Sequence, residues 1–381
     1  MHMQVVVGLR RLGYDAYYFE TTSAWPYDPN RGQRVCASEY AVRYLARVAD
    51  DFGLDGHWAY RRSYADTAWF GLGRGEAEDL LAHADAVLNI AGATRVAVDG
   101  LKAGRLVYFG TDPGHDDIAI AKGAEDVRWI VEEHDDFVTY GENIGSPGCP
   151  IPRLPGLRAR TRQPVLLDLW QPCSPSRPHF TTVANWKQTG RDIEYRGDTY
   201  YWSKDREFLK FIDLPKRVEQ PIELALNLAD SETIHPTSEP VRAPGVSRDE
   251  RSRLVANGWR LVDAHPITTD PWTYRDYLQA SRGEFTVAKD LNVRLRSGWF
   301  SERSACYLAA GRPVITQDTG FDAVLPTGEG LFAFNTMDDV IAAFNAIQSD
   351  YDKHSRAARA IAEEYFKAET VLAKVIRDLG L

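Results

Sequence analysis

Short apolar runs alternate with amphipathic stretches along most of the chain. In the first half, the runs at 86–90, 105–109 and 136–140 predict buried strands, and the stretches at 38–52 and 75–84 have helical periodicity. Strands that alternate with helices are typical of α/β proteins built on parallel sheets. We therefore expect an α/β fold with parallel sheets.

The second half repeats the alternation. Strands are expected at 180–186, 221–227, 259–262, 284–288 and 314–316, a hairpin at 193–201, helices at 203–212, 247–257, 272–281 and 301–310, and closing helices that begin near 336, 350 and 369. Because the same pattern occurs twice, the sequence predicts two α/β domains.

The distribution of prolines separates these domains. Eight of the twenty prolines lie between Pro147 and Pro178, a density that a continuous helix or a central strand would not tolerate. We expect an N-terminal domain at 1–150, a connection at 151–178, a second domain at 179–350 and closing helices at 351–381.

The chain begins in the middle of a strand–helix–strand unit. A helix is expected at 3–12 and a strand at 14–19, with no strand ahead of the helix. Either about 10 to 20 residues, the usual length of such a unit, are missing ahead of residue 1, or the fold differs from a Rossmann-like one.

The most informative stretch runs from Ser297 to Phe321. Gly311 and Pro313 end the expected helix, a β-branched strand follows, and the turn at 318–320 lies at the strand's C-terminal end. Ligands bind at that edge in open α/β sheets. The loop at Ser297 and Gly298 offers backbone N–H groups at a helix N-terminus, a position that favours phosphate.

This stretch resembles the nucleotide-sugar half-site of glycosyltransferases with the GT-B fold. The resemblance implies two Rossmann-like domains that face each other across a cleft, with a nucleoside-diphosphate sugar in the C-terminal domain and an acceptor in the N-terminal one. It also implies that the final helix packs back on the first domain. Many retaining members carry two glutamates where this chain has Gly298 and Cys306. Glu302, one turn away, could replace the carboxylate that holds the donor ribose. The absence of both glutamates favours an inverting mechanism.

The expected donor site combines cations with small and polar residues. Cations stabilise the charge that grows on a leaving diphosphate, and turn residues hydrogen-bond sugar hydroxyls. The candidate donor-binding residues are Asn185, Lys187, Lys289, Arg294, Arg296, Gly298, Ser301, Asp318, Thr319 and Gly320.

Asp112 and His115 are the candidate catalytic residues, because they follow an expected strand of the N-terminal domain. Either side chain could accept the proton of an acceptor hydroxyl. Asp112 also precedes Pro113 at an expected helix start, so helix capping is an equally good explanation. Glu142 is the reserve candidate.

Two other functions remain possible from the sequence. The clusters His115-Asp116-Asp117 and His134-Asp135-Asp136 contain metal-ligand residue types, which a metal-dependent phosphohydrolase would need. The two absent glutamates suggest instead a sugar-nucleotide-binding protein without catalysis. The favoured interpretation needs neither a metal nor a cofactor besides the co-substrate.

Composition narrows the classes of molecule that the protein is expected to bind and the compartment in which it is expected to work. The net charge is -9, and scattered Lys and Arg argue against nucleic acid. No apolar run reaches the roughly 18 to 20 residues of a membrane span, and no signal peptide is recognisable. The four cysteines lack metal-ligand spacing, which favours a reducing cytoplasm. The nucleotide, the sugar, the acceptor and the oligomeric state stay open.

Overall fold

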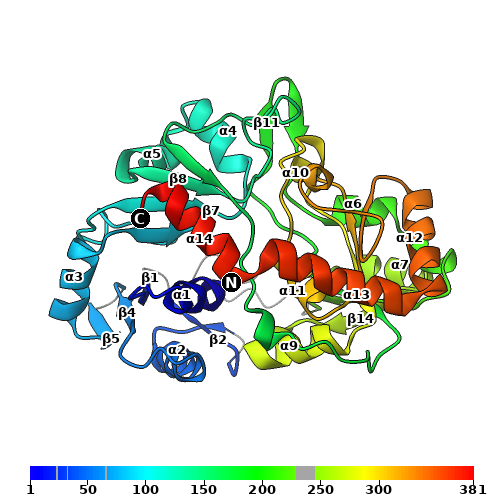
Figure 1. Ribbon diagram of the computed structural model, residues 1–381, viewed down its shortest axis with the longest axis horizontal. Helices are drawn as coiled ribbons and strands as arrows, with labels where there is room; N and C mark the ends of the chain where they lie inside the picture. Colours follow the sequence, from blue (N-terminus) through cyan, green and yellow to red (C-terminus); the bar gives the residue numbers. More distant parts are fainter. Residues whose placement is uncertain (23–24, 32, 65–66, 229–244) are drawn as a thin grey trace.

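The computed structural model describes residues 1–22, 25–31, 33–64, 67–228 and 245–381. Figure 1 shows two lobes joined near the middle of the chain. The proline-rich segment 229–244 lies outside the described residues.

The C-terminal lobe contains a six-stranded sheet in the order β14-β13-β10-β15-β16-β17, in which all neighbouring strands are parallel. Its strands are β10 (Phe180–Val183), β13 (Ile222–Leu226), β14 (Arg260–Asp263), β15 (Gly283–Thr286), β16 (Val314–Gln317) and β17 (Leu331–Phe334). Every residue of β13, β15 and β16 is buried, as expected for parallel strands covered on both faces.

Helices cover both faces of this sheet. One apolar cluster packs α9 (Pro271–Ala280), α11 (Glu302–Ala309) and α13 (Tyr351–Ile361) against the strands. The opposite cluster includes α6 (Asp205–Lys210), α7 (Arg248–Ala256) and α12 (Met337–Ser349). The two clusters explain why the second half of the sequence alternates so regularly.

The N-terminal lobe is built on two larger sheets. One is parallel, in the order β6-β7-β8-β9, and the other has the order β1-β4-β5. Their strands are β1 (Tyr18–Thr22), β4 (Trp58–Arg62), β5 (Ala68–Gly71), β6 (Val87–Ile90), β7 (Leu106–Gly110), β8 (Asp136–Thr139) and β9 (Leu157–Arg160); β2 (Tyr27–Asp28) and β3 (Gln33–Arg34) form a small ribbon. The sequence pattern missed β4, β5 and β9, and β9 places part of the expected 151–178 connection in the N-terminal sheet.

Helices around this lobe link it to the end of the chain. Helix α14 (Ala368–Leu379) contacts both α1 (His2–Arg11) and β9, and Figure 1 shows it crossing from the C-terminal lobe to the N-terminal one. The remaining helices of the lobe are α2 (Glu39–Asp51), α3 (Arg74–His83), α4 (His115–Ala121) and α5 (Trp129–Glu133). In the connection, 167–169 forms a short 3-10 helix.

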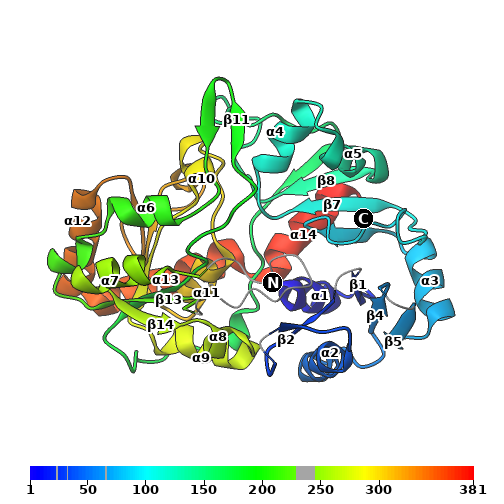
Figure 2. The ribbon, with the colours of Figure 1, turned by 180° about the vertical axis from the view of Figure 1, so that it is seen from behind.

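A hairpin of the C-terminal lobe reaches the N-terminal lobe. It consists of β11 (Ile193–Tyr195) and β12 (Asp198–Tyr200), between β10 and α6. Lys122 Nζ donates to the Glu194 carbonyl at 3.0 Å, and Tyr195 Oη donates to the Pro150 carbonyl at 2.9 Å. Figures 1 and 2 both show β11 beside α4. Apolar side chains of both lobes share one cluster here, so the lobes are packed together and not merely tethered.

Among the described residues, no helix is both long and apolar enough to cross a membrane.

Candidate functional site

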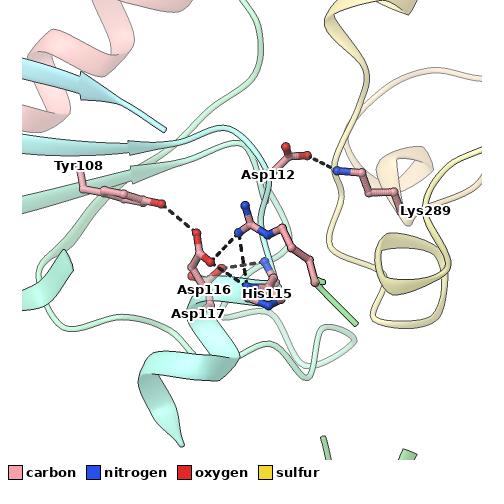
Figure 3. Close-up of polar contacts among 8 residues, drawn as sticks. Tyr108, Asp112, His115, Asp116, Asp117 and Lys289 are labelled. Atoms are coloured by element: carbon pink, nitrogen blue, oxygen red, sulfur yellow. Dashed lines mark hydrogen bonds and ion pairs between the residues drawn. The ribbon is translucent and has the colours of Figure 1, made fainter. Parts of the chain in front are cut away.

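The two lobes meet through an ion pair at the C-terminal ends of two strands. Asp112 follows β7 and Lys289 follows β15, and their side chains lie 3.0 Å apart (Figure 3). The Lys289 ammonium also lies 3.4 Å from the ring centroid of Trp202. Burial lowers the pKa of Lys289, although the Asp112 carboxylate opposes this shift. The structure therefore brings together a predicted donor-binding residue and a predicted catalytic residue.

Asp112 does not cap the neighbouring helix. Helix α4 begins after Gly114, and the Asp117 carboxylate accepts the Gly114 N–H at 2.7 Å. Burial raises the pKa of Asp117 to about 6. A Cβ atom on Gly114, whose φ is +108°, would overlap the Leu291 side chain, so glycine permits this close approach of the lobes. The capping explanation for Asp112 is wrong, because a residue further along supplies the cap.

Lys204 is a cation that the sequence analysis did not select. It lies directly before α6, is only 7% exposed, and its ammonium has no hydrogen-bond or ion-pair partner among the described residues. Burial, reinforced by the charges of Arg303 and Lys289, lowers the pKa of Lys204 to about 7. A buried ammonium without a partner is costly, and an anionic ligand would remove that cost.

Arg303 is the second residue that was missed, although it lies in the first turn of the helix predicted at 301–310. Its Nη1 donates to the Val183 carbonyl at 2.6 Å and its Nη2 to Thr286 at 2.9 Å, while Nε pairs with Glu284. The Arg303 charge is therefore balanced by a carboxylate. Lys289 is likewise paired with Asp112. Of the three neighbouring cations Lys204, Lys289 and Arg303, Lys204 is therefore the one without a carboxylate partner among the described residues.

His115 belongs to a polar cluster beside the ion pair (Figure 3). Its Nδ1 lies 2.8 Å from Asp116, which also accepts from Arg191 at 2.6 Å and from Tyr108 at 3.2 Å. Burial opposes ionisation of Asp116, but the contacts with His115 and Arg191 outweigh it and lower its pKa. A carboxylate that orients an imidazole is a common arrangement around a general base.

A second contact between the lobes involves the predicted turn. The Asn143 side-chain amide donates to the carbonyls of Arg296 at 3.1 Å and Gly320 at 2.9 Å. Gly298 has a φ of +77°, and a Cβ there would lie 2.8 Å from Asn143. Arg296 is bonded to Asp318 at 2.9 Å. Asp318 therefore has a protein partner where a sugar hydroxyl was expected.

Several predicted donor-binding residues make their contacts away from Lys204, Lys289 and Arg303. Lys187 pairs with Glu250 of α7 at 2.8 Å. Arg294 donates to the Thr199 carbonyl at 2.7 Å, so it binds the hairpin. The other predicted donor residues are placed as follows: Asn185 is exposed, Ser301 occupies the N-cap position of α11, and buried Thr319 donates to the Trp299 carbonyl.

Local sequence could not show these partners, because the hairpin and α7 approach from distant parts of the chain. Glu302, the possible replacement for the absent carboxylates, accepts from Gln4 at 2.9 Å.

The residues of the two His-Asp-Asp clusters have other partners. His134 Nδ1 lies 2.8 Å from the Ile130 carbonyl and Nε2 lies 2.9 Å from Asn89, and Asp136 pairs with Arg105 and Arg158. In the described parts of the chain, no three His, Cys, Asp or Glu side chains are grouped as a metal site would need. The geometry gives the phosphohydrolase hypothesis no support.

Solved structures share this fold. The Anabaena protein HepE in complex with UDP and glucose matches with a TM-score of 0.54 and 11% identity, covering 96% of this chain and 99% of that one. HepE in complex with UDP-glucose matches with a TM-score of 0.51 at 11% identity and the same coverage of 96% and 99%. Sucrose-phosphate synthase from Thermosynechococcus elongatus gives 0.49 at 11% identity, covering 99% and 92%.

No protein-family model matches the sequence, and no curated protein matches it in sequence. The parallel sheets of the two lobes and the superposition on HepE define the architecture. The chain has the GT-B fold, as the sequence predicted. At 11% identity this likeness establishes the fold and not the activity.

Proposed function

We propose that the protein is a glycosyltransferase that moves a sugar from a nucleoside-diphosphate sugar to an acceptor hydroxyl. The single observation that carries the proposal is Lys204, a buried side chain beside Lys289 whose ammonium has no hydrogen-bond or ion-pair partner among the described residues, close to strand ends where ligands bind in open α/β sheets. A diphosphate between the two ammonium groups would neutralise both. HepE, which shares the fold, has been crystallised with UDP-glucose.

In the proposed reaction, the acceptor oxygen attacks the anomeric carbon from the face opposite the diphosphate. The new bond joins that oxygen to the carbon, and the bond from the carbon to the phosphate oxygen breaks with its electrons passing to the diphosphate. Lys204 and Lys289 stabilise the developing negative charge. Asp112 takes the proton of the acceptor hydroxyl.

The Asp112–Lys289 pair gives this scheme an internal switch. In the ligand-free protein the carboxylate is neutralised by the ammonium at 3.0 Å. A diphosphate that recruits Lys289 frees the carboxylate to act as a base. His115, oriented by Asp116, is the second candidate for this role.

The decisive assay measures UDP-glucose consumption with a panel of hydroxyl acceptors. Asp112→Asn should lower transfer by about a hundredfold or more, because a general base contributes roughly 10²- to 10⁴-fold. Donor affinity should be maintained or improved, because Lys289 loses its competing partner. Asp126→Asn, at an exposed position of the same lobe, is the control and should transfer normally.

Full transfer by Asp112→Asn would refute the base assignment, and loss in His115→Ala alone would move the role to His115. UDP, dTDP and GDP sugars should first be compared by thermal shift, since a ligand that binds the folded state raises its stability. Transfer is expected to survive exhaustive chelation of metals, because the lysines take the place of a metal at the diphosphate.

A binding protein without catalysis is the second candidate. It is favoured by the Asp112–Lys289 pair, which occupies the candidate base, and by Gly298 and Cys306 at the positions of the expected carboxylates. UDP-glucose that binds by calorimetry but stays intact with every acceptor would select this candidate.

A further inference from the structure

A separate cavity lies between the lobes. Its volume is about 690 Å³, which is within the usual size range of small-molecule sites. The N-terminal lobe contributes the loop after β8, strand β9 and helix α14, and the C-terminal lobe contributes Arg296 and the segment 320–324. The Asn143 side chain, bonded to Arg296 and Gly320, forms part of its wall. Lys204 and Lys289 are not among its lining residues.

Two arginines of β9 line this cavity together. Arg158 and Arg160 are two residues apart on a strand whose burial alternates, so both side chains lie on the exposed face of the strand. Residues two apart on a strand are separated by roughly 7 Å. Guanidinium groups of two arginines on the same strand face can contact oxygens of one phosphate.

The charge on the β9 wall is balanced only in part by carboxylates. Asp136 is shared by two guanidinium groups, those of Arg105 and Arg158. Arg160 donates to the Ile144 carbonyl at 3.1 Å and has no carboxylate partner among the described residues. The other charged groups of the cavity are paired within their own lobe: Lys374 with Asp378, Glu142 with Arg162, and Arg296 with Asp318. The surplus positive charge therefore lies on β9.

We propose that this cavity is a second anion site, which binds the phosphate group of a small phosphorylated molecule through Arg158 and Arg160. The site is distinct from the diphosphate seat at Lys204 and does not depend on transfer activity. Because both lobes line the cavity, a bound ligand also contacts the Asn143 bridge between them.

The test is calorimetric titration of the full chain with inorganic phosphate at low ionic strength. Lys204→Met serves as the background, because it removes the uncompensated charge of the proposed donor site. In that background phosphate should still bind, and adding Arg160→Gln or Arg158→Gln should weaken binding about tenfold or more, the expected effect of losing a charge-assisted contact.

Arg128→Gln is the matched control, since Arg128 and Arg158 side chains are both 59% exposed and Arg128 pairs with the neighbouring Glu125 and Glu132. It should leave phosphate affinity unchanged. Circular dichroism melting of each variant confirms that a loss of binding is not a loss of folding. Absence of phosphate binding in Lys204→Met, or unchanged affinity after Arg160→Gln, would overturn the proposal.

A second titration, with UDP, separates the two anion sites. UDP affinity should fall in Lys204→Met and stay unchanged in Arg160→Gln. A loss of UDP affinity in Arg160→Gln would mean that the arginines belong to the donor site, and the second site would be refuted. Neither titration requires transfer, so failure of the enzymatic proposal would leave this result interpretable.

Discussion

Lys204 shows how one residue can combine an instability with a binding function. Desolvation disfavours its charged form, and the balancing carboxylates nearby are already paired with Arg303 and Lys289. While Lys204 is protonated, the folded state therefore carries a cost that a bound anion would remove. Retaining such a group makes physical sense at a ligand site and little sense in a core.

The titration of Lys204 predicts how stability depends on pH. An unfolded lysine titrates near 10.5 and the folded one at about 7. Between these values the unfolded chain binds more protons, so stability rises with pH from about 7 to 10.5. At roughly 1.4 kcal/mol per unit of pKa, the rise amounts to at most about 4 to 5 kcal/mol.

Lys204→Met should abolish this rise. The variant should be more stable than the parent protein at pH 6, by up to the same amount, and the difference should shrink towards pH 10. Chemical denaturation at pH 6, 7.5 and 9 measures it. Lys216→Met, at a lysine whose ammonium bonds Asn257 on the surface, is the control and should not change the pH dependence. A constant difference at all pH values would show that Lys204 is not a buried ammonium.

Among the elements, the β11–β12 hairpin links the two lobes through several polar contacts. Arg191, just before it, donates to Asp116 at 2.6 Å and lies 4.6 Å from the Trp202 ring centroid. Arg191→Gln should lower the free energy of unfolding by about 1 to 3 kcal/mol, because Asp116 is partly buried and loses a charged partner. The pKa of Asp116 should rise at the same time, because Arg191 helps to lower it.

Urea denaturation tests the effect on stability. Arg206→Gln is a suitable control, since this exposed arginine stacks on Tyr201 at 3.7 Å and has no carboxylate partner in the described ranges. The control should cost about 0.5 kcal/mol or less. Equal effects of the two substitutions would mean that the hairpin contact contributes no more than an ordinary surface contact.

The β11–β12 hairpin illustrates which features of the structure the sequence could predict and which it could not. Helices, parallel strands and the hairpin itself follow from local periodicity, and the stretch 297–321 has the predicted helix, left-handed Gly311 and strand. The pairing partners do not follow from periodicity. Lys289 and Asp112 meet only because both lobes are present, and Arg294 binds the hairpin because β12 folds beside it.

Lys204 was missed for a similar reason. A lysine before a short helix looks like a surface residue, because Lys is rarely buried. Its burial results from the hairpin and from the lobe-to-lobe packing around Trp202, which no window of sequence contains. The missed strands are short: β4 is buried at four consecutive residues, including Arg61, and β9 alternates over only four residues within a proline-rich stretch.

At the scale of the whole molecule, two further contacts join the lobes besides the Asp112–Lys289 ion pair and the Asn143 bridge. In the first, the hairpin lies beside α4, as Figures 1 and 2 show, and in the second, side chains of α2 and the residue after it contact α9. In the second contact, Trp272 stacks on Phe52 with ring centroids 5.3 Å apart and donates to Asp51 at 2.7 Å, while Arg47 pairs with Asp270 at 2.6 Å. Such contacts bias the protein towards a closed arrangement of the lobes.

Trp272→Leu should shift this balance towards an open arrangement. It removes a stacked ring pair worth about 0.5 to 1.5 kcal/mol beyond its buried area, and a hydrogen bond worth about 1 kcal/mol. A loss near 1.4 kcal/mol changes the closed-to-open ratio tenfold. Small-angle scattering should therefore show a larger radius of gyration without ligand, and a saturating nucleotide that contacts both lobes should restore the smaller value.

Trp129→Leu provides the matched control, because that ring contacts Arg95 and His134 within the N-terminal lobe. If both variants scatter like the parent protein, the α2–α9 contact does not hold the lobes closed, and the other contacts between the lobes maintain their arrangement.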